Sequence, residues 1–189
     1  MASVTDYIKK MLDSAKVRKL RNELQPGLYM GSITGLTYER REKREKLGKA
    51  FWIDVVLDEA ESVNGSEPTE AGTHLDFPIL LEGANADMSF NDLKTFLVEL
   101  TGCDPSEASA KYDELVDVIN DEGKHVNPAG INQPARGMRV VIETYTRKTK
   151  TGKNAGKERT YPRWKRFDQS AADISANRKR LDDLERAAA

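Results

Sequence analysis

The segment from Gly137 to Phe167 constrains the fold most strongly, because it predicts two β-strands joined by a basic loop. In its first half, Met138, Val140 and Ile142 occupy alternate positions, as in a strand with one buried face. In its second half, aromatic residues are interleaved with Lys and Arg. The pattern predicts an antiparallel hairpin with a solvated tip rich in Lys, Thr, Gly and Asn.

Positive charge is concentrated in this hairpin. The range Arg136 to Arg166 contains eleven Lys or Arg and two Glu, a net charge of +9 in a chain whose total is -1. The range Asp54 to Glu122 contains eighteen Asp or Glu and two Lys, a net charge of -16. Such segregation predicts a polyanionic partner for the hairpin, with the acidic block facing elsewhere. A hairpin that is merely solvated is the competing interpretation.

Length and composition narrow the class of protein. A chain of 189 residues with 38% hydrophobic content predicts one domain with additions. The single Cys103 excludes an internal disulfide, and no Cys or His spacing predicts a metal site, so no cofactor is expected. No apolar stretch is long enough for a membrane span or a signal peptide, which predicts a cytoplasmic protein.

The rest of the chain predicts further strands and helices. Strands are expected at Leu28–Tyr38, Ala50–Leu57 and Thr73–Leu81, and helices at Ser89–Gly102 and from Pro105 to about Asp121. For the charged connector Glu39–Lys49, a mobile loop is favoured over a short helix. The expected organisation is a basic N-terminal helix (1–25), a main domain (26–167) with a helical insertion (89–122), and a weakly packed C-terminal helix or tail (168–189).

This order of elements indicates a fold. Three strands, a helical insertion and two strands follow each other as in the oligonucleotide-binding (OB) fold. The expected class is therefore mainly β with α insertions: a five-stranded Greek-key barrel with the insertion between strands three and four.

Three stretches of the chain resemble the single-stranded DNA-binding proteins of tailed bacteriophages. They are the glycine-containing strand LYMGSITGL, the strand FWIDVVL and the basic-aromatic last hairpin, and the resemblance covers about Pro26 to Phe167. It implies largely sequence-independent binding of single-stranded DNA in phage-type replication or recombination, in the host cytoplasm. Replication or recombination proteins are the implied partners. Many such proteins recruit partners through an acidic tail, whereas this chain ends RKRLDDLERAAA, so recruitment by that route is in doubt.

The candidate nucleic-acid contacts are rings that stack on bases and cations that neutralise phosphates. They are Trp52, Arg139, Tyr145, Arg147, Lys148, Lys150, Lys153, Lys157, Arg159, Tyr161, Arg163, Trp164 and Lys165. Trp52 is the favoured outward-facing ring, because it alternates with Phe51 and Ile53.

Other functions remain as alternatives. Enzymatic activity is not expected, because the run GKNAGKE lacks the spacing of a phosphate loop and no catalytic set is recognisable. A nuclease is therefore disfavoured. A structural or adaptor function is an open alternative. In that case the acidic block of one subunit would meet the basic hairpin of another in a homo-oligomer. The choice between DNA and RNA also stays open.

Overall fold

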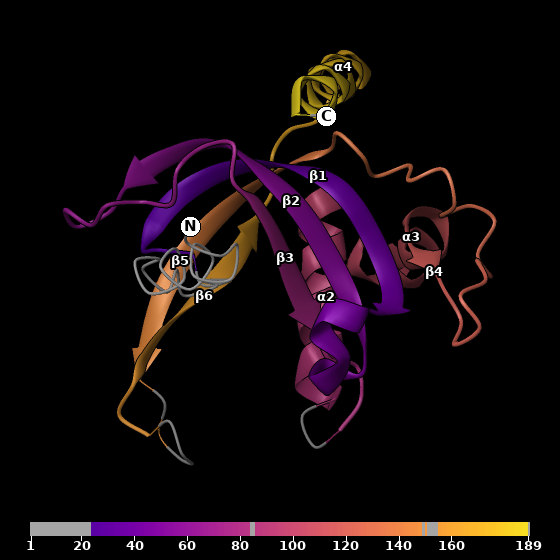
Figure 1. Cartoon of the computed structure of the whole chain (residues 1–189), viewed down its shortest axis with the longest axis horizontal. Helices are drawn as coiled ribbons and strands as arrows, with labels where there is room; N and C mark the ends of the chain where they lie inside the picture. The colour runs from indigo at the N-terminus through magenta and orange to yellow at the C-terminus, as the bar shows by residue number, and fades with distance from the viewer. Residues whose placement is uncertain (1–23, 84–85, 149, 151–154, 189) are drawn as a thin grey trace, which may run out of the picture.

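The structure is a computed structural model that describes residues 24–83, 86–148, 150 and 155–188. It is mainly β, with one open sheet in the order β3-β2-β1-β5-β6, to which the short β4 adds by pairing with β1 (Figure 1). The strands are β1 (Gly27–Arg40), β2 (Lys49–Ser62), β3 (His74–Ile79), β4 (Asp117–Val118), β5 (Arg139–Lys148) and β6 (Glu158–Lys165). β4 runs parallel to β1, and the other pairs are antiparallel.

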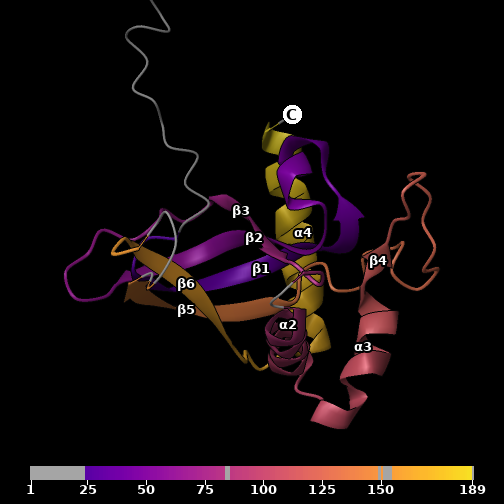
Figure 2. The ribbon, with the colours of Figure 1, turned by 90° about the horizontal axis from the view of Figure 1, so that it is seen from below.

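Helices lie on both sides of this sheet. They are α2 (Ala86–Thr101), α3 (Ala108–Leu115) and α4 (Ala171–Ala188), with short 3-10 helices η1 (Glu42–Leu47) and η2 (Pro105–Glu107). Figure 1 shows α2 beneath the arch of β1 and α4 above it. Figure 2 shows α3 and β4 at the opposite end of the molecule from the β5–β6 hairpin. None of the described helices is long and apolar enough to cross a membrane.

The predicted bend of the first strand is present at its glycines. The β1–β2 register shifts between Met30 and Gly31 and again between Ile33 and Gly35, and such bulges curve a strand. A Cβ added at Gly31 would lie 2.5 Å from Cγ1 of Val55, so the close approach of β2 requires glycine there. This curvature lets β1 pair with β2 on one side and β5 on the other.

The core fills the concave side of the sheet. Alternation along β2 directs Phe51, Ile53 and Val55 inward, as predicted, and α2 covers them with Phe96 and other apolar residues. The two edge strands also meet there. Phe77 of β3 and Trp164 of β6 pack edge-to-face with their ring centroids 5.2 Å apart, and Phe96 lies 5.0 Å from Trp164.

The C-terminal helix is mostly exposed and is held on the convex side by a few specific contacts. The Asn177 side-chain amide donates to the Gly137 carbonyl at 2.8 Å, and Arg180 forms an ion pair with the nearly buried Asp58. Leu181 is also buried. These contacts are made by a few residues of a polar helix, which explains why amphipathicity alone did not indicate them.

The structure corrects two further predictions, on the connector after β1 and on the end of α3. The connector after β1 forms η1, so the short helix and not the mobile loop is closer to the structure. The helix expected to reach Asp121 ends at Leu115, because Val116 turns to an extended conformation and Asp117 begins the pairing of β4 with β1. The basic N-terminal helix predicted for residues 1–25 lies almost entirely outside the described residues.

Candidate nucleic-acid interface

The register of β5 and β6 sorts the predicted contact residues onto two faces. Directly opposed residues of an antiparallel pair share a face, and Val140 and Ile142 point into the core. The other face of the hairpin is therefore the outer one, on which Tyr145 opposes Tyr161. Seven predicted contact residues belong to this basic hairpin face: Arg139, Tyr145, Arg147, Arg159, Tyr161, Arg163 and Lys165.

Part of the hairpin extends beyond the rest of the sheet. Pairing of β5 with β1 ends where Glu143 opposes Leu28, whereas pairing with β6 continues to Lys148. Thr144 fixes the base of this arm, because its hydroxyl accepts from the Gly27 amide at 2.7 Å and donates to the Gly27 carbonyl at 2.9 Å. The arm projects at the lower left of Figure 1, so a ligand can approach it without meeting the other strands.

Aromatic and guanidinium groups stack on this arm. Tyr145 and Tyr161 are 41% and 37% exposed, and their rings stack with centroids 5.6 Å apart and an interplanar angle of 26°. The Arg163 guanidinium carbon lies 5.2 Å from the Tyr145 centroid. Flat π surfaces of this kind stack on any nucleobase without reading its identity.

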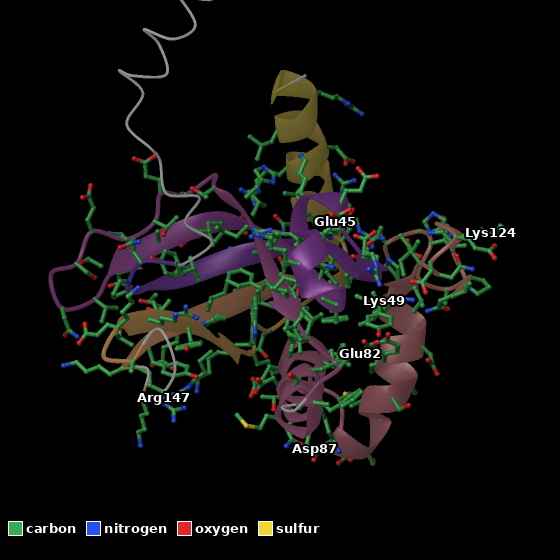
Figure 3. The ribbon with its side chains drawn as sticks, turned by 60° about the horizontal axis from the view of Figure 1, so that its bottom comes forward. Glu45, Lys49, Glu82, Asp87, Lys124 and Arg147 are labelled. Carbon is green, nitrogen blue, oxygen red and sulfur yellow. The ribbon has the colours of Figure 1, made fainter. Side chains whose placement is uncertain are left out.

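Positive charge on the arm is poorly compensated. Arg147 lies directly opposite Arg159, and like charges in that position destabilise a strand pair. Within the described part of the chain, neither arginine forms an ion pair with a carboxylate. Arg163 contacts Glu143 at 3.6 Å, but both side chains are about half exposed, so the pair is weak. Figure 3 shows Arg147 at the end of the arm, well away from Glu82 and Asp87.

The remaining predicted cations do not lie together with Arg147, Arg159 and Arg163 on one surface. Lys148 lies on the other face of the hairpin and pairs with Glu158 at 3.6 Å. Lys150 and Lys157 are exposed near the tip, and Lys153 lies outside the described residues. Arg139 lies at the α4 end, 3.9 Å from the Asp58 carboxylate.

The prediction that Trp52 is an exposed stacking ring is wrong. Trp52 points to the outer face of β2, as alternation predicted, but it is fully buried. The guanidinium of Arg41 lies 4.5 Å from its ring centroid, and its indole nitrogen donates to the Glu39 carbonyl at 3.1 Å. Asp54 holds Arg41 in place through two hydrogen bonds of 2.7 and 2.6 Å.

Trp164 is also unsuited to stacking on the basic hairpin face. It lies on the core side of β6, opposite Ile142, and its ring contacts Phe77 and Phe96. Both tryptophans therefore serve the fold, and the exposed tyrosine pair is the remaining candidate for base stacking.

The replacement Trp52→Phe tests this reassignment. We expect it to leave the affinity for oligonucleotides within about twofold of the parent, because the ring is covered by Arg41. Loss of the hydrogen bond to Glu39 should lower the free energy of unfolding by about 1 kcal/mol. Oligonucleotide titration and urea denaturation measure the two quantities. A large loss of affinity at nearly unchanged stability would return Trp52 to the binding site.

The outer face of β2 and β3 is closed by η1. Asp54 and Asp76 oppose each other across these strands, and Arg41 and Arg44 reach over to pair with them. The Arg44–Asp76 separation is 3.1 Å. Because its carboxylates and cations already neutralise each other, this face offers little attraction to a phosphate backbone.

A groove between α2 and α3 has a volume of about 650 Å³ and a mostly apolar lining that includes Phe90, Leu97 and Tyr112. Burial raises the pKa of Tyr112 to about 12, so its hydroxyl stays neutral at physiological pH. The groove lies within the acidic block, near Glu82 and Asp87. An apolar hollow in acidic surroundings does not suit a polyanion.

No group of three or more His, Cys, Asp or Glu in the described ranges is placed to hold a metal ion. Comparison with protein-family models and with curated proteins finds no match to this chain. The geometry of the surface is therefore the basis for inferring a function.

Several residues that shape this surface have no signal in the sequence pattern. Arg41 and Arg44 close the β2–β3 face, and Glu59 and Glu61 lie on the same outer face as the basic hairpin residues, two strands away from β5. Only part of the acidic block therefore faces elsewhere. Pairing registers across three strands decide these positions, and periodicity within one strand does not reveal them.

Proposed function

We propose that this chain is a non-enzymatic, largely sequence-independent single-stranded DNA-binding protein that uses the basic hairpin face. The observation that carries the proposal is the β5–β6 register, which puts a stacked tyrosine pair and the opposed Arg147 and Arg159 on one projecting surface. Phosphates are attracted by the cations, and unpaired bases stack on the rings. A duplex hides its base faces, so the tyrosine pair favours single strands.

The strand order supports an OB-type fold as the finer assignment. Consecutive strands β1, β2 and β3 lie side by side, and β5 returns by a long connection to the free side of β1, which is the Greek-key arrangement. Helix α2 follows β3, as the OB fold requires, and that fold is described as a partly open barrel. OB domains bind oligonucleotides on strands two and three. Here η1 closes that face, so we place the DNA along β5 and β6.

The biological role follows from the sequence resemblance. A protein of this kind protects single-stranded DNA during phage-type replication or recombination, in the cytoplasm, where it meets replication or recombination proteins. The described residues supply the DNA surface.

Fluorescence anisotropy tests the proposal. Labelled oligo-dT of about 30 nucleotides, matched single-stranded RNA and matched duplex are titrated with the full chain at low and moderate salt. We expect salt-sensitive binding with a preference for single strands. Binding that is equal for duplex and single strands, or absent, would refute the proposal.

The double substitution Tyr145→Leu with Tyr161→Leu measures the contribution of base stacking to the binding free energy. We expect a loss of about 1 to 3 kcal/mol per stacked base, with an unchanged salt slope, because the cations remain. The matched control is Tyr145→Phe with Tyr161→Phe, which keeps both rings and should bind like the parent. If the leucine variant binds single strands as tightly as the phenylalanine variant, the rings do not stack on bases.

A further inference from the structure

The groove between α2 and α3 is an apolar surface that solvent reaches. Leu97 of α2 and Tyr112 of α3 line it from the two sides, and Phe90, which also lines it, is 52% exposed. Its volume of about 650 Å³ can receive several apolar side chains. Figure 2 shows the two helices side by side, and such a pair can receive the apolar face of a third helix.

Carboxylates surround this groove. Residues 81–122, which form most of its walls, contain eleven Asp or Glu and two Lys, a net charge of -9. Figure 3 shows Glu82 and Asp87 beside α2. Burial raises the pKa of Tyr38, which lines the groove, and the nearby carboxylates of Glu82 and Asp121 raise this pKa further. The groove therefore suits a helix that is apolar on one face and carries basic residues beside it.

The N-terminal segment of the same chain has this combination in its sequence. Residues 1–23 lie outside the described ranges and contain six Lys or Arg and three Asp or Glu, a net charge of +3. At 3.6 residues per turn, a helix over residues 4–15 would carry Asp6 and Asp13 on one face and five apolar side chains on the opposite face. The five are Val4, Ile8, Met11, Leu12 and Ala15. Four cations follow, namely Lys16, Arg18, Lys19 and Arg21.

We infer that residues 4–15 dock as a helix in the groove between α2 and α3 of their own chain. The apolar face packs on Phe90, Leu97 and Tyr112, and the four cations after it meet the carboxylates around the groove. A helix of twelve residues is about 18 Å long, which is also about the combined length of η2 and α3. The contact does not involve nucleic acid, so the inference does not rest on the proposed function.

The chain is long enough for docking within one molecule. Tyr38 lies eleven residues after Gly27, at most about 36 Å away along β1, and the bulges that curve β1 shorten the direct path. Residues 16–23 can span about 28 Å, and the docked helix adds its own length of about 18 Å. A short tether also gives the segment an effective concentration of about millimolar, so a modest affinity is sufficient.

Hydrogen exchange of the full chain, followed by mass spectrometry without nucleic acid, tests the inference. We expect the amides of residues 5–15 to exchange at least about tenfold more slowly in the parent than in two docking variants. One variant carries Ile8→Asp and Leu12→Asp, which put charge on the apolar face of the segment. The other carries Phe90→Lys and Ser109→Arg, which put two cations where the basic segment would pack.

The matched control carries Ser14→Asp and Val17→Asp, which change the net charge of the segment equally but away from its apolar face, and it should keep the protection. Slow exchange in β1 and β2 shows in the same experiment that each variant is folded. Protection that survives in the groove variant, or is absent from the parent, overturns the inference. Protection that rises with protein concentration over a range of about a hundredfold also overturns it, because the segment then binds a second copy.

Discussion

Replacing Phe96 with alanine is expected to lower the free energy of unfolding by about 3 to 5 kcal/mol. Phe96 of α2 is fully buried. Its ring centroid lies 6.1 Å from that of Phe51 in β2 and 5.0 Å from that of Trp164 in β6. Removing the ring leaves a cavity at the point where the helix meets both halves of the sheet. Because domains are stable by only about 5 to 15 kcal/mol, this variant should be close to unfolding.

Urea denaturation followed by circular dichroism measures this loss. Phe90→Ala is the matched control, because Phe90 lies in the same helix but is 52% exposed. We expect it to cost less than about 1 kcal/mol. Similar losses for the two variants would contradict the packing of α2 described above.

Neutralising four cations of the basic hairpin face is expected to weaken single-strand binding by about 10² to 10³-fold at 0.1 M salt. The variant combines Arg147→Gln, Arg159→Gln, Arg163→Gln and Lys165→Gln. Each lost phosphate contact should reduce the slope of log affinity against log salt by roughly 0.7, so the total change should be about 2.8. Stability should not fall, because the opposed Arg147 and Arg159 repel each other in the parent.

Anisotropy titrations at several salt concentrations measure both quantities. The control carries Lys43→Gln, Lys46→Gln, Lys124→Gln and Lys179→Gln, which change the total charge equally at exposed positions outside the basic hairpin face. We expect this control to keep nearly the full slope. Equal losses in the two variants would mean that binding follows net charge and not this surface.

Periodicity in the sequence predicted most of the elements correctly. The alternation of Phe51, Ile53 and Val55 identified β2 and its buried face, and Val140 and Ile142 did the same for β5. From β1 onward, the predicted strands and helices follow each other in the expected order, with β4 as an additional short strand. The OB barrel itself remains a prediction, because the described sheet is open.

The failures have a common physical cause, which is contact between segments that are distant in the chain. Trp52 was placed on the correct face of its strand, but Arg41 of the preceding connector covers it. Apolar residues after Leu115 fit a helix as well as a strand, and the pairing of Asp117 with β1 decides between them. Likewise, the sequence left open which aromatic residues belong to the core, and the hairpin register places Tyr145 and Tyr161 side by side on the outer face.

The two edges of the sheet are connected by a ring contact between Phe77 and Trp164. Such a contact contributes about 0.5 to 1.5 kcal/mol beyond the area it buries, so it opens more readily than a ladder of hydrogen bonds. Backbone hydrogen bonds join the neighbouring strands of the described sheet, whereas packing of aromatic side chains alone closes the gap between β3 and β6.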